Sequence, residues 1–490
     1  MLITYQQLLK SLNLARTLII VCVLISSFNC LGADIKLPML GDTSSGIVSK
    51  NQEYKLGKAW LQAFRRHVKQ HDDPLIQTYL EQLTYDLVTH SELEDTRLTL
   101  VLVNNPNINA FAVPGGIIGV HTGIFTHADN EDQLASIISH EIAHLSQRHF
   151  ARGLESKRNS AHINLAGLLA TIIVSSQAGA DAGMAALSAT QAIAADQQLR
   201  YSRNNEKEAD RLGLKIMQRS GRDPYASAEI LEKMMAMTRY KGSRLPEFLL
   251  THPMTEKRVS DTRSRALKYQ KRHYPDNFDF YIMQARALVL HQNKPNYSID
   301  YFRQKIASNS IRSEAYHYGL AVSYSQAGNH LKAKEYLSKL IQKKPTYAPY
   351  IYTDIETDIS AGNYRLALQK LNHQLEFNKG NYPLLMLQAD ALWKSHQYQS
   401  SAKVLTHLSK ERPEDPSIWY QLAEVSGLAG NIAEVHKARA EYFILIGSLE
   451  SAKRQLGYAK KLLQKDIKGF AIVEQRLIEI EDMETNLKKL

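Results

Sequence analysis

The feature that most constrains the fold of this chain is a spacing in its second half. Gly-Asn pairs begin at residues 328, 362 and 430, so they stand 34 and 68 residues apart, and His396 holds the missing place in that register. Short helical patterns flank these pairs from about Phe278, and Pro345 and Pro413 share a register of their own. A fixed period of this length is typical of stacked helix pairs, with glycine at the turn and proline at the end of the unit. We therefore expect an all-helical array over residues 271–490.

A second pattern, His140-Glu141-Ile142-Ala143-His144, lies within an apolar helical stretch. Residues four apart project from the same face of a helix, so His140 and His144 can bind one metal ion together. Zinc is the metal that this pattern indicates, and Glu141 is placed to take a proton from its water. Because zinc lowers the pKa of water from about 15.7 to roughly 7, the pattern predicts hydrolysis near neutral pH.

Length and composition limit the remaining choices. A chain of 490 residues is too long for one ordinary core, and 44% hydrophobic with 22% charged residues is typical of folded proteins. We expect an export signal at 1–33, a linker at 34–50, a zinc metallopeptidase domain at 51–270 and the repeat domain at 271–490. The net charge is +11, but no dense Lys/Arg block carries interleaved aromatic residues, so nucleic acid is not an expected partner.

Residues 1–33 look like a cleaved export signal, because two basic residues and a short apolar run precede small residues. The run falls short of the ~20 residues that a membrane-spanning helix needs, although an uncleaved anchor is an alternative. Cys22 and Cys30 both lie in this segment. A mature chain that starts near Asp34 would therefore contain no thiol and no disulfide.

Two stretches ahead of the histidine pair are rich in strand-forming residues. Residues 98–103 are one, and residues 109–120 predict two short strands around the turn at Pro114, Gly115 and Gly116. Beside a zinc site, an exposed edge strand can bind an extended substrate by adding it to the sheet. An ordinary hairpin is the alternative that these residues leave open.

A later acidic helix, within residues 202–213, supplies candidates for the rest of the site. At helical spacing Glu206 and Asp210 share one face, while Glu208 points elsewhere. Glu206 would complete a His-His-Glu zinc site with one position left for water. Asp210 would hydrogen-bond the outer nitrogen of a ligating histidine. An acidic helix in water gives the same pattern, so the prediction depends on the upstream histidines.

The letters HEIAH at 140–144, EKEAD at 206–210 and NAFAVPGG at 109–116 together resemble the HtpX-like and CAAX-prenyl-protease-like zinc metalloendopeptidases. An export signal followed by repeats of tetratricopeptide type looks most like the periplasmic β-barrel assembly-enhancing branch of Gram-negative bacteria. The resemblance implies that His140, His144 and Glu206 bind one zinc ion per subunit, with Glu141 as the catalytic base. It also implies a periplasmic location and quality control of misassembled outer-membrane proteins, in contact with their assembly machinery.

Three further features leave alternatives open. His252 precedes Pro253 and is therefore loop-like; it is either a turn residue or a further zinc ligand that displaces the water and keeps the enzyme latent. His149 we expect at the surface or in packing, outside the site, and Phe150 at the place of a third metzincin histidine excludes that class. Residues 165–195 are apolar and then Ala/Gly-rich. They predict a helix near the site, with a lid or a membrane-touching hairpin as the alternative.

We therefore predict an α+β, mainly helical fold: a zinc metallopeptidase domain with a small β-sheet, followed by an all-α tetratricopeptide-like solenoid. Glu141 and Asp210 form the catalytic set, Glu141 as base and Asp210 through the histidine that it orients. Substrates are polypeptides, and peripheral membrane contact is an open expectation. The alternative function is a chaperone or scaffold for outer-membrane protein assembly with a latent protease site. A structural zinc site is disfavoured, because such sites commonly use cysteine.

Overall fold

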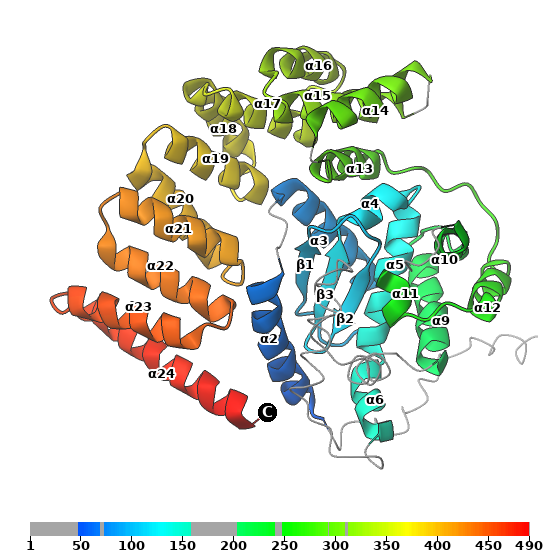
Figure 1. The fold of residues 1–490 in the computed structure, drawn as a ribbon, viewed down its shortest axis with the longest axis horizontal. Helices are drawn as coiled ribbons and strands as arrows, with labels where there is room; N and C mark the ends of the chain where they lie inside the picture. Colours follow the sequence, from blue (N-terminus) through cyan, green and yellow to red (C-terminus); the bar gives the residue numbers. More distant parts are fainter. Residues whose placement is uncertain are drawn as a thin grey trace, which may run out of the picture. The chain divides into compact units, whose positions relative to one another are not determined.

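The computed structural model describes residues 48–68, 73–157, 203–240, 247–292, 294–308 and 312–489, and Ile47–Leu490 forms one compact unit (Figure 1). The expected export signal, most of the linker and residues 165–195 lie outside the described residues. The described part is mainly helical with one small sheet, which confirms the predicted fold class. Among the described residues, no helix is both long enough and apolar enough to cross a membrane.

The sheet has three strands, β1 (Thr99–Val103), β2 (Ala110–Val113) and β3 (Ile117–His121), in the order β1-β3-β2. β1 runs parallel to β3, and β2 pairs antiparallel with β3 so that Val113 lies opposite Ile117. Gly115 and Gly116 form the turn with φ of 83° and 80°, a region that favours glycine. The predicted hairpin is confirmed, and β2 is an edge strand. All four of its side chains are buried.

Helices cover both faces of this sheet. On one face α2 (Lys50–His67) buries Trp60 and Phe64 against Phe111. On the other face α3 (Pro74–Thr89) and α5 (Glu131–Ser146) share one apolar core with the sheet. The remaining helices before the repeats are α4 (Gly123–His127), α6 (His149–Lys157), α9 (Arg203–Arg219), α10 (Tyr225–Tyr240), α11 (Glu247–Thr251) and α12 (Glu256–Ala266).

The two helices that carry the predicted site are held closely together. Asn130 is the N-cap of α5, and its side-chain oxygen accepts a hydrogen bond from the Gln133 amide, so the first turn is capped. α9 packs along α5, and a side chain at Gly213 would stand 3.3 Å from the backbone nitrogen of His140. The absence of a side chain at Gly213 therefore lets α9 approach the histidine helix closely.

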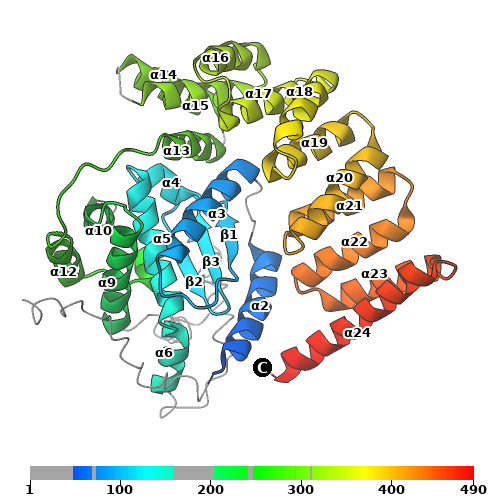
Figure 2. The same ribbon diagram turned by 180° about the vertical axis from the view of Figure 1, so that it is seen from behind.

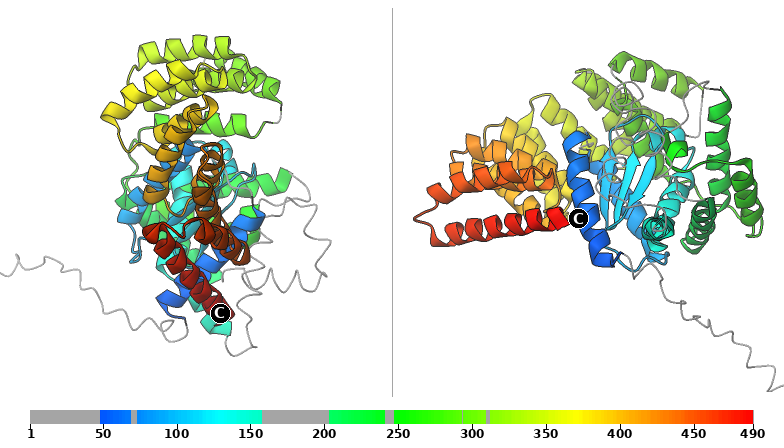
Figure 3. Two further views of the ribbon diagram at one scale, coloured as in Figure 1. Left: turned by 90° about the vertical axis from the view of Figure 1, so that its left-hand side faces the viewer. Right: turned by 60° about the horizontal axis from the view of Figure 1, so that its bottom comes forward.

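The second half consists of stacked helix pairs (Figures 1 and 3). Gly328, Gly362 and Gly430 stand at the turns inside three pairs with φ between 75° and 80°, and His396 takes the same place with φ of 62°. At each turn an amide bonds a carbonyl five residues earlier, as between Asn329 and Tyr324. This confirms the predicted register. The helices are α13 (Phe278–Leu290), α14 (Pro295–Ala307), α15 (Ser313–Gln326), α16 (His330–Lys343), α17 (Ala348–Ser360), α18 (Tyr364–Phe377), α19 (Tyr382–Lys394), α20 (Tyr398–Glu411), α21 (Pro416–Leu428), α22 (Ile432–Leu445), α23 (Leu449–Leu462) and α24 (Ile467–Lys489).

The repeats contact the first half of the chain at both of their ends. Phe280 of α13 stacks on Phe125 of α4 with ring centroids 6.3 Å apart. At the far end, the Gln62 side chain of α2 donates a hydrogen bond to the Ile444 carbonyl, and Figure 2 shows α2 between the sheet and these last helices. One apolar core runs from α3 into α19, across the expected boundary at residue 270. That boundary stays a prediction.

Candidate metal centre and active site

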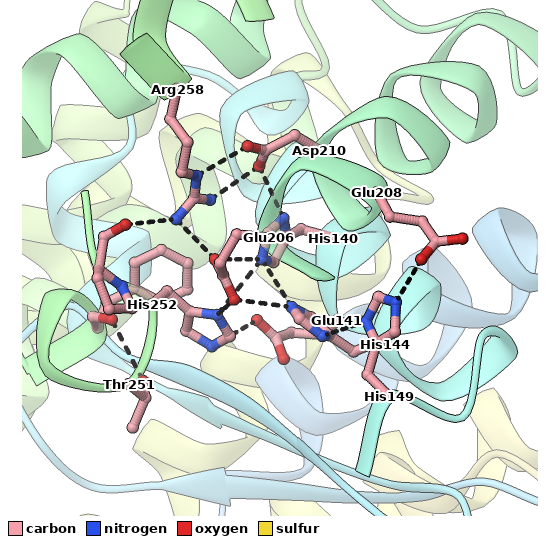
Figure 4. A network of polar contacts seen from close by, with 12 residues as sticks. His140, Glu141, His144, His149, Glu206, Glu208, Asp210, Thr251, His252 and Arg258 are labelled. Carbon is pink, nitrogen blue, oxygen red and sulfur yellow. Dashed lines mark hydrogen bonds and ion pairs between the residues drawn. The ribbon is translucent and has the colours of Figure 1, made fainter. Parts of the chain in front are cut away.

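Three of the predicted site residues come from one helix, α5. His140 and His144 lie one turn apart, and their Nε2 atoms stand 3.0 Å from each other (Figure 4). Both rings are buried, at 6% and 2% exposure, and Glu141 is completely buried. The helix reaches this interior position because its neighbouring residues, such as Ile138 and Ile142, are core residues on other faces. The histidine pair therefore faces the protein and not the solvent.

α9 brings Glu206 to the same point. Its Oε1 lies 3.4 Å from His144 Nε2, and its Oε2 lies 3.5 Å from His140 Nε2. Burial alone would raise the pKa of Glu206, but the facing His252 and the hydrogen bonds of the two histidines lower it well below its usual value. The carboxylate is therefore ionised and directed at both imidazoles, as the helical spacing predicted.

His252, directly after α11, completes the cluster. Its Nδ1 lies 3.2 Å from Glu206 Oε1 and 3.4 Å from His140 Nε2, and its ring is fully buried. One donor atom from each of His140, His144, Glu206 and His252 lies within 4.8 Å of the others. The sequence allowed two roles for His252, a turn residue or a metal ligand. In the structure its ring nitrogen lies among the side-chain atoms that could bind a metal.

The separations of these donors fit one zinc ion. Ligands at about 2.0–2.1 Å in tetrahedral array stand roughly 3.3–3.4 Å apart. The separations from His140 Nε2 are 3.0 Å to His144, 3.5 Å to Glu206 and 3.4 Å to His252, and one donor atom from each of the four residues lies within 4.8 Å of the others. A set of two or three imidazoles and one carboxylate also suits zinc, whereas magnesium and calcium bind mainly oxygen ligands. The cluster could therefore hold one metal ion, and its donor set is of a kind that suits zinc.

Asp210, one turn after Glu206, lies behind the cluster. Its Oδ1 is 3.0 Å from His140 Nδ1, the nitrogen that faces away from the other donors. Burial alone would raise the pKa of Asp210, but Arg258 and His140 hold it below its usual value. Burial lowers the pKa of His140, yet Asp210 and Glu206 raise it to about 10. The negative charge that favours a proton on His140 equally favours a cation bound there.

Arg258 of α12 joins the two carboxylates. Its Nε and Nη2 donate to the two oxygens of Asp210, each at 2.8 Å, and its Nη1 forms an ion pair with Glu206 Oε2 at 2.6 Å. A further bond from Nη1 reaches the Pro253 carbonyl at 3.2 Å and ties the guanidinium to the loop of His252. The side chain is only 3% exposed. Sequence reasoning gave Arg258 no role, because no spacing relates α12 to α5 or α9.

Glu141 points to the interior beside the donors. Its Oε1 lies 3.4 Å from His252 Nε2, and burial raises the pKa of the carboxyl. A carboxylate of raised pKa is a better proton acceptor near neutral pH than an exposed one. The edge strand β2 packs against α5, the helix that carries Glu141.

His149 lies within the network, although the sequence placed it outside the site. Its ring is buried, and its Nδ1 stands 2.8 Å from His144 Nδ1. Its Nε2 lies 3.1 Å from Oε2 of Glu208, the carboxylate of α9 that was expected to point away from Glu206. A histidine five residues after His144 gives no helical signal for this contact, because an unbroken helix would separate the two rings.

Comparison with known proteins agrees with this geometry. Residues 74–266 match Peptidase family M48. The β-barrel assembly-enhancing protease of Escherichia coli (strain K12) is 32% identical over 456 residues, 92% of this chain and 92% of that protein. The protein of the same name from Yersinia pestis is 33% identical over 85% of each chain. The mitochondrial metalloendopeptidase OMA1 of Arabidopsis thaliana is 30% identical over 38% of this chain and 35% of its own length.

The first two relatives are matched over nearly their whole length, so the likeness covers both the metal cluster and the helical repeats. The OMA1 protein is matched over a part only, of 187 residues, much as the family match is limited to 74–266. The predicted family is confirmed: the chain is a metallopeptidase that belongs to the β-barrel assembly-enhancing protease family, with a Peptidase family M48 region at residues 74–266.

Proposed function

We propose that the protein is a zinc-dependent endopeptidase that holds one zinc ion per subunit through His140, His144 and Glu206. The observation that carries this proposal is the cluster of buried donor atoms, which lie within 4.8 Å of one another and are of the types that zinc binds. Zinc bound there supplies Lewis-acid chemistry: it makes water more acidic and polarises a scissile carbonyl.

The chain's own residues then carry the proton and hold the geometry. Glu141 accepts a proton from the attacking water and returns it to the leaving amine, a role that its raised pKa suits. Asp210 fixes the proton of His140 on Nδ1 and leaves Nε2 free to bind the metal. β2, at the edge of the sheet and against α5, is the strand to which an extended substrate would add.

His252 gives the site a latent form in this proposal. His252 Nδ1 lies close enough to Glu206 and His140 to be a fourth protein ligand, which would take the place of the water that catalysis needs. The same ring lies against Glu141. Cleavage therefore requires His252 to leave, and the His252→Ala protein should cleave an unstructured substrate faster than wild type. Equal rates at equal zinc content would argue against latency.

The substrates and location follow from the relatives and the repeats. The relatives are named for enhancing β-barrel assembly, and stacked helix pairs form surfaces suited to partly folded chains. We propose that this protein works in the periplasm on misassembled envelope proteins, with the repeats binding substrate or the outer-membrane assembly machinery. The export signal expected at residues 1–33 supports that location. Contact of residues 165–195 with membrane or with the site stays an expectation.

The central test separates metal binding from cleavage. Glu141→Gln should retain zinc, measured by mass spectrometry of the purified protein, and lose casein cleavage. Glu206→Gln should lose both. Glu232→Gln is a matched control, because Glu232 pairs with Arg263 at the surface, where exposed pairs contribute little. Full cleavage by the Glu141→Gln protein, or wild-type zinc content in the Glu206→Gln protein, would refute the proposal.

A second candidate function is a chaperone or scaffold in which the repeats do most of the work. The observation that favours it is His252, which closes the donor set around the expected metal position. A cell that carries only the Glu141→Gln protein discriminates the two functions. Normal assembly of outer-membrane β-barrels in that cell would support the scaffold, and accumulation of misassembled barrels would support proteolysis.

A further inference from the structure

His149 reaches the metal cluster through an unusual backbone turn. α5 ends at Ser146, and Gln147 is its C-cap. Arg148 has a φ of 48°, a left-handed backbone conformation that residues other than glycine rarely adopt. α6 then begins at His149 itself. In a continuous helix, residues five apart point about 140° away from each other. The break at Arg148 turns His149 back onto His144.

The left-handed residue is held in place by its own side chain. Arg148 Nε donates to Glu53 Oε2 at 2.9 Å, and Nη2 donates to the Val48 carbonyl at 2.6 Å. Both the arginine and its carboxylate partner are largely buried, at 12% and 11% side-chain exposure. Such conformations persist where surrounding contacts impose them, and they cluster at functional sites.

The ring nitrogens then have one consistent proton assignment. His144 turns Nε2 toward His140 and Glu206, so a metal-binding His144 carries its proton on Nδ1. That proton is donated to Nδ1 of His149, 2.8 Å away. His149 therefore carries its own proton on Nε2 and donates it to Glu208 Oε2 at 3.1 Å. Arg152 Nη1, 2.9 Å from the same oxygen, holds the carboxylate in place.

We propose that His149 is a positioning residue for the metal site, which fixes the ring and tautomer of His144 and is itself fixed by Glu208. The inference rests on the proposed function, since it assumes that His144 binds zinc. It gives each metal-facing histidine of α5 a buried partner: Asp210 acts directly on His140, and His149 with Glu208 acts on His144. Such partners typically change metal affinity 10- to 100-fold.

The test compares two substitutions of nearly identical shape. In the full-length protein, the His149→Asn side chain supplies an amide oxygen that can replace Nδ1 of His149 as the acceptor from His144 Nδ1, whereas the His149→Leu side chain has no acceptor. Zinc affinity is measured by competition with a chromophoric chelator at fixed pH. We expect His149→Leu to bind zinc about 10- to 100-fold more weakly than wild type and His149→Asn to stay within about threefold of it. A residue that only fills space would weaken affinity equally in both variants, and that result would overturn the proposal.

Two further proteins keep the result interpretable. Glu208→Ala alters a side chain with 29% exposure, so it should fold even where the His149→Leu protein does not. We expect it to weaken zinc binding about three- to tenfold, and unchanged affinity in both Glu208→Ala and His149→Leu would overturn the proposal. Glu206→Gln reports on the zinc site itself. If the wild-type protein binds zinc and the Glu206→Gln protein does not, the proposed zinc site is correct. An unchanged zinc affinity of the His149→Leu protein would then refute only the role proposed for His149.

Discussion

Replacing Asp210 by asparagine should damage both the stability and the metal affinity of the protein. Both carboxylate oxygens accept hydrogen bonds: Oδ1 from His140 at 3.0 Å and from Arg258 at 2.8 Å, and Oδ2 from Arg258 at 2.8 Å. An asparagine has one acceptor oxygen, so its NH2 group must face a donor of Arg258 or of His140. The substitution thus removes the charge and creates one donor-donor contact.

The magnitude follows from the burial of the pair. Removing one partner of a buried ion pair costs about 3–5 kcal/mol, and Arg258 keeps its bond to Glu206, so we expect a loss near the lower limit, about 3 kcal/mol. Weaker orientation of His140 should reduce zinc affinity about 10- to 100-fold. Asp261→Asn is the matched control: Asp261 pairs with Arg265 at 40% and 38% exposure, where about 0.5 kcal/mol or less is expected.

The assay is urea unfolding of the metal-free proteins, followed by circular dichroism, together with zinc competition on the folded proteins. The Asp210→Asn midpoint should fall well below that of Asp261→Asn, which should stay close to wild type. If the two variants unfold at the same urea concentration and bind zinc equally well, then the network around Asp210 does not stabilise the site as its hydrogen bonds indicate.

Two other predictions follow from the structure. Gly57→Ala in α2 would place a methyl group 2.0 Å from the Pro114 carbonyl oxygen, so it should destabilise the protein by about 1–3 kcal/mol. Gly457→Ala in α23 would place a methyl group within 4 Å of no atom beyond its own stretch of helix, so it should stabilise the protein by about 0.5–1 kcal/mol. Equal shifts of the unfolding midpoint in the two variants would contradict this prediction. Zinc at about 100 times its dissociation constant should stabilise the wild-type protein by about 2.7 kcal/mol, and a chelator should remove this stabilisation. If the melting temperature of the wild-type protein does not change with zinc, the proposed zinc site is wrong.

The parts of this fold that were predictable from sequence are those set by local spacing. The i, i+4 step places His140 and His144 on one face wherever α5 lies, and the step from Glu206 to Asp210 does the same on α9. The 34-residue spacing of the turns includes His396, which adopts a positive φ although it is not a glycine. The spacing is predictable because each turn is formed by local backbone hydrogen bonds, such as that from the Gln397 amide to the Leu392 carbonyl.

The parts that were not predictable depend on contacts between distant segments. His149 meets His144 only because Arg148 adopts a left-handed backbone, and Arg148 does so while paired with Glu53, nearly a hundred residues earlier. His252 lies beside the other metal-binding side chains because α11 packs at β2 and the Phe248 amide donates to the carbonyl of Ile108, which precedes that strand. No periodicity within either segment encodes these contacts, so the sequence pattern left the role of His252 open and placed His149 outside the site.

Charge accounting would have narrowed that gap. The sequence places three carboxylates at one buried point, Glu141, Glu206 and Asp210, and buried charge is costly unless it is compensated. The pKa values of Glu206 and Asp210 are held low, so these two carboxylates are charged, whereas burial raises the pKa of Glu141. Arg258, from the helix that follows His252, contacts both Glu206 and Asp210 and compensates their charge. A basic partner for a buried carboxylate pair can be expected from the motif, while the identity of that partner depends on the fold.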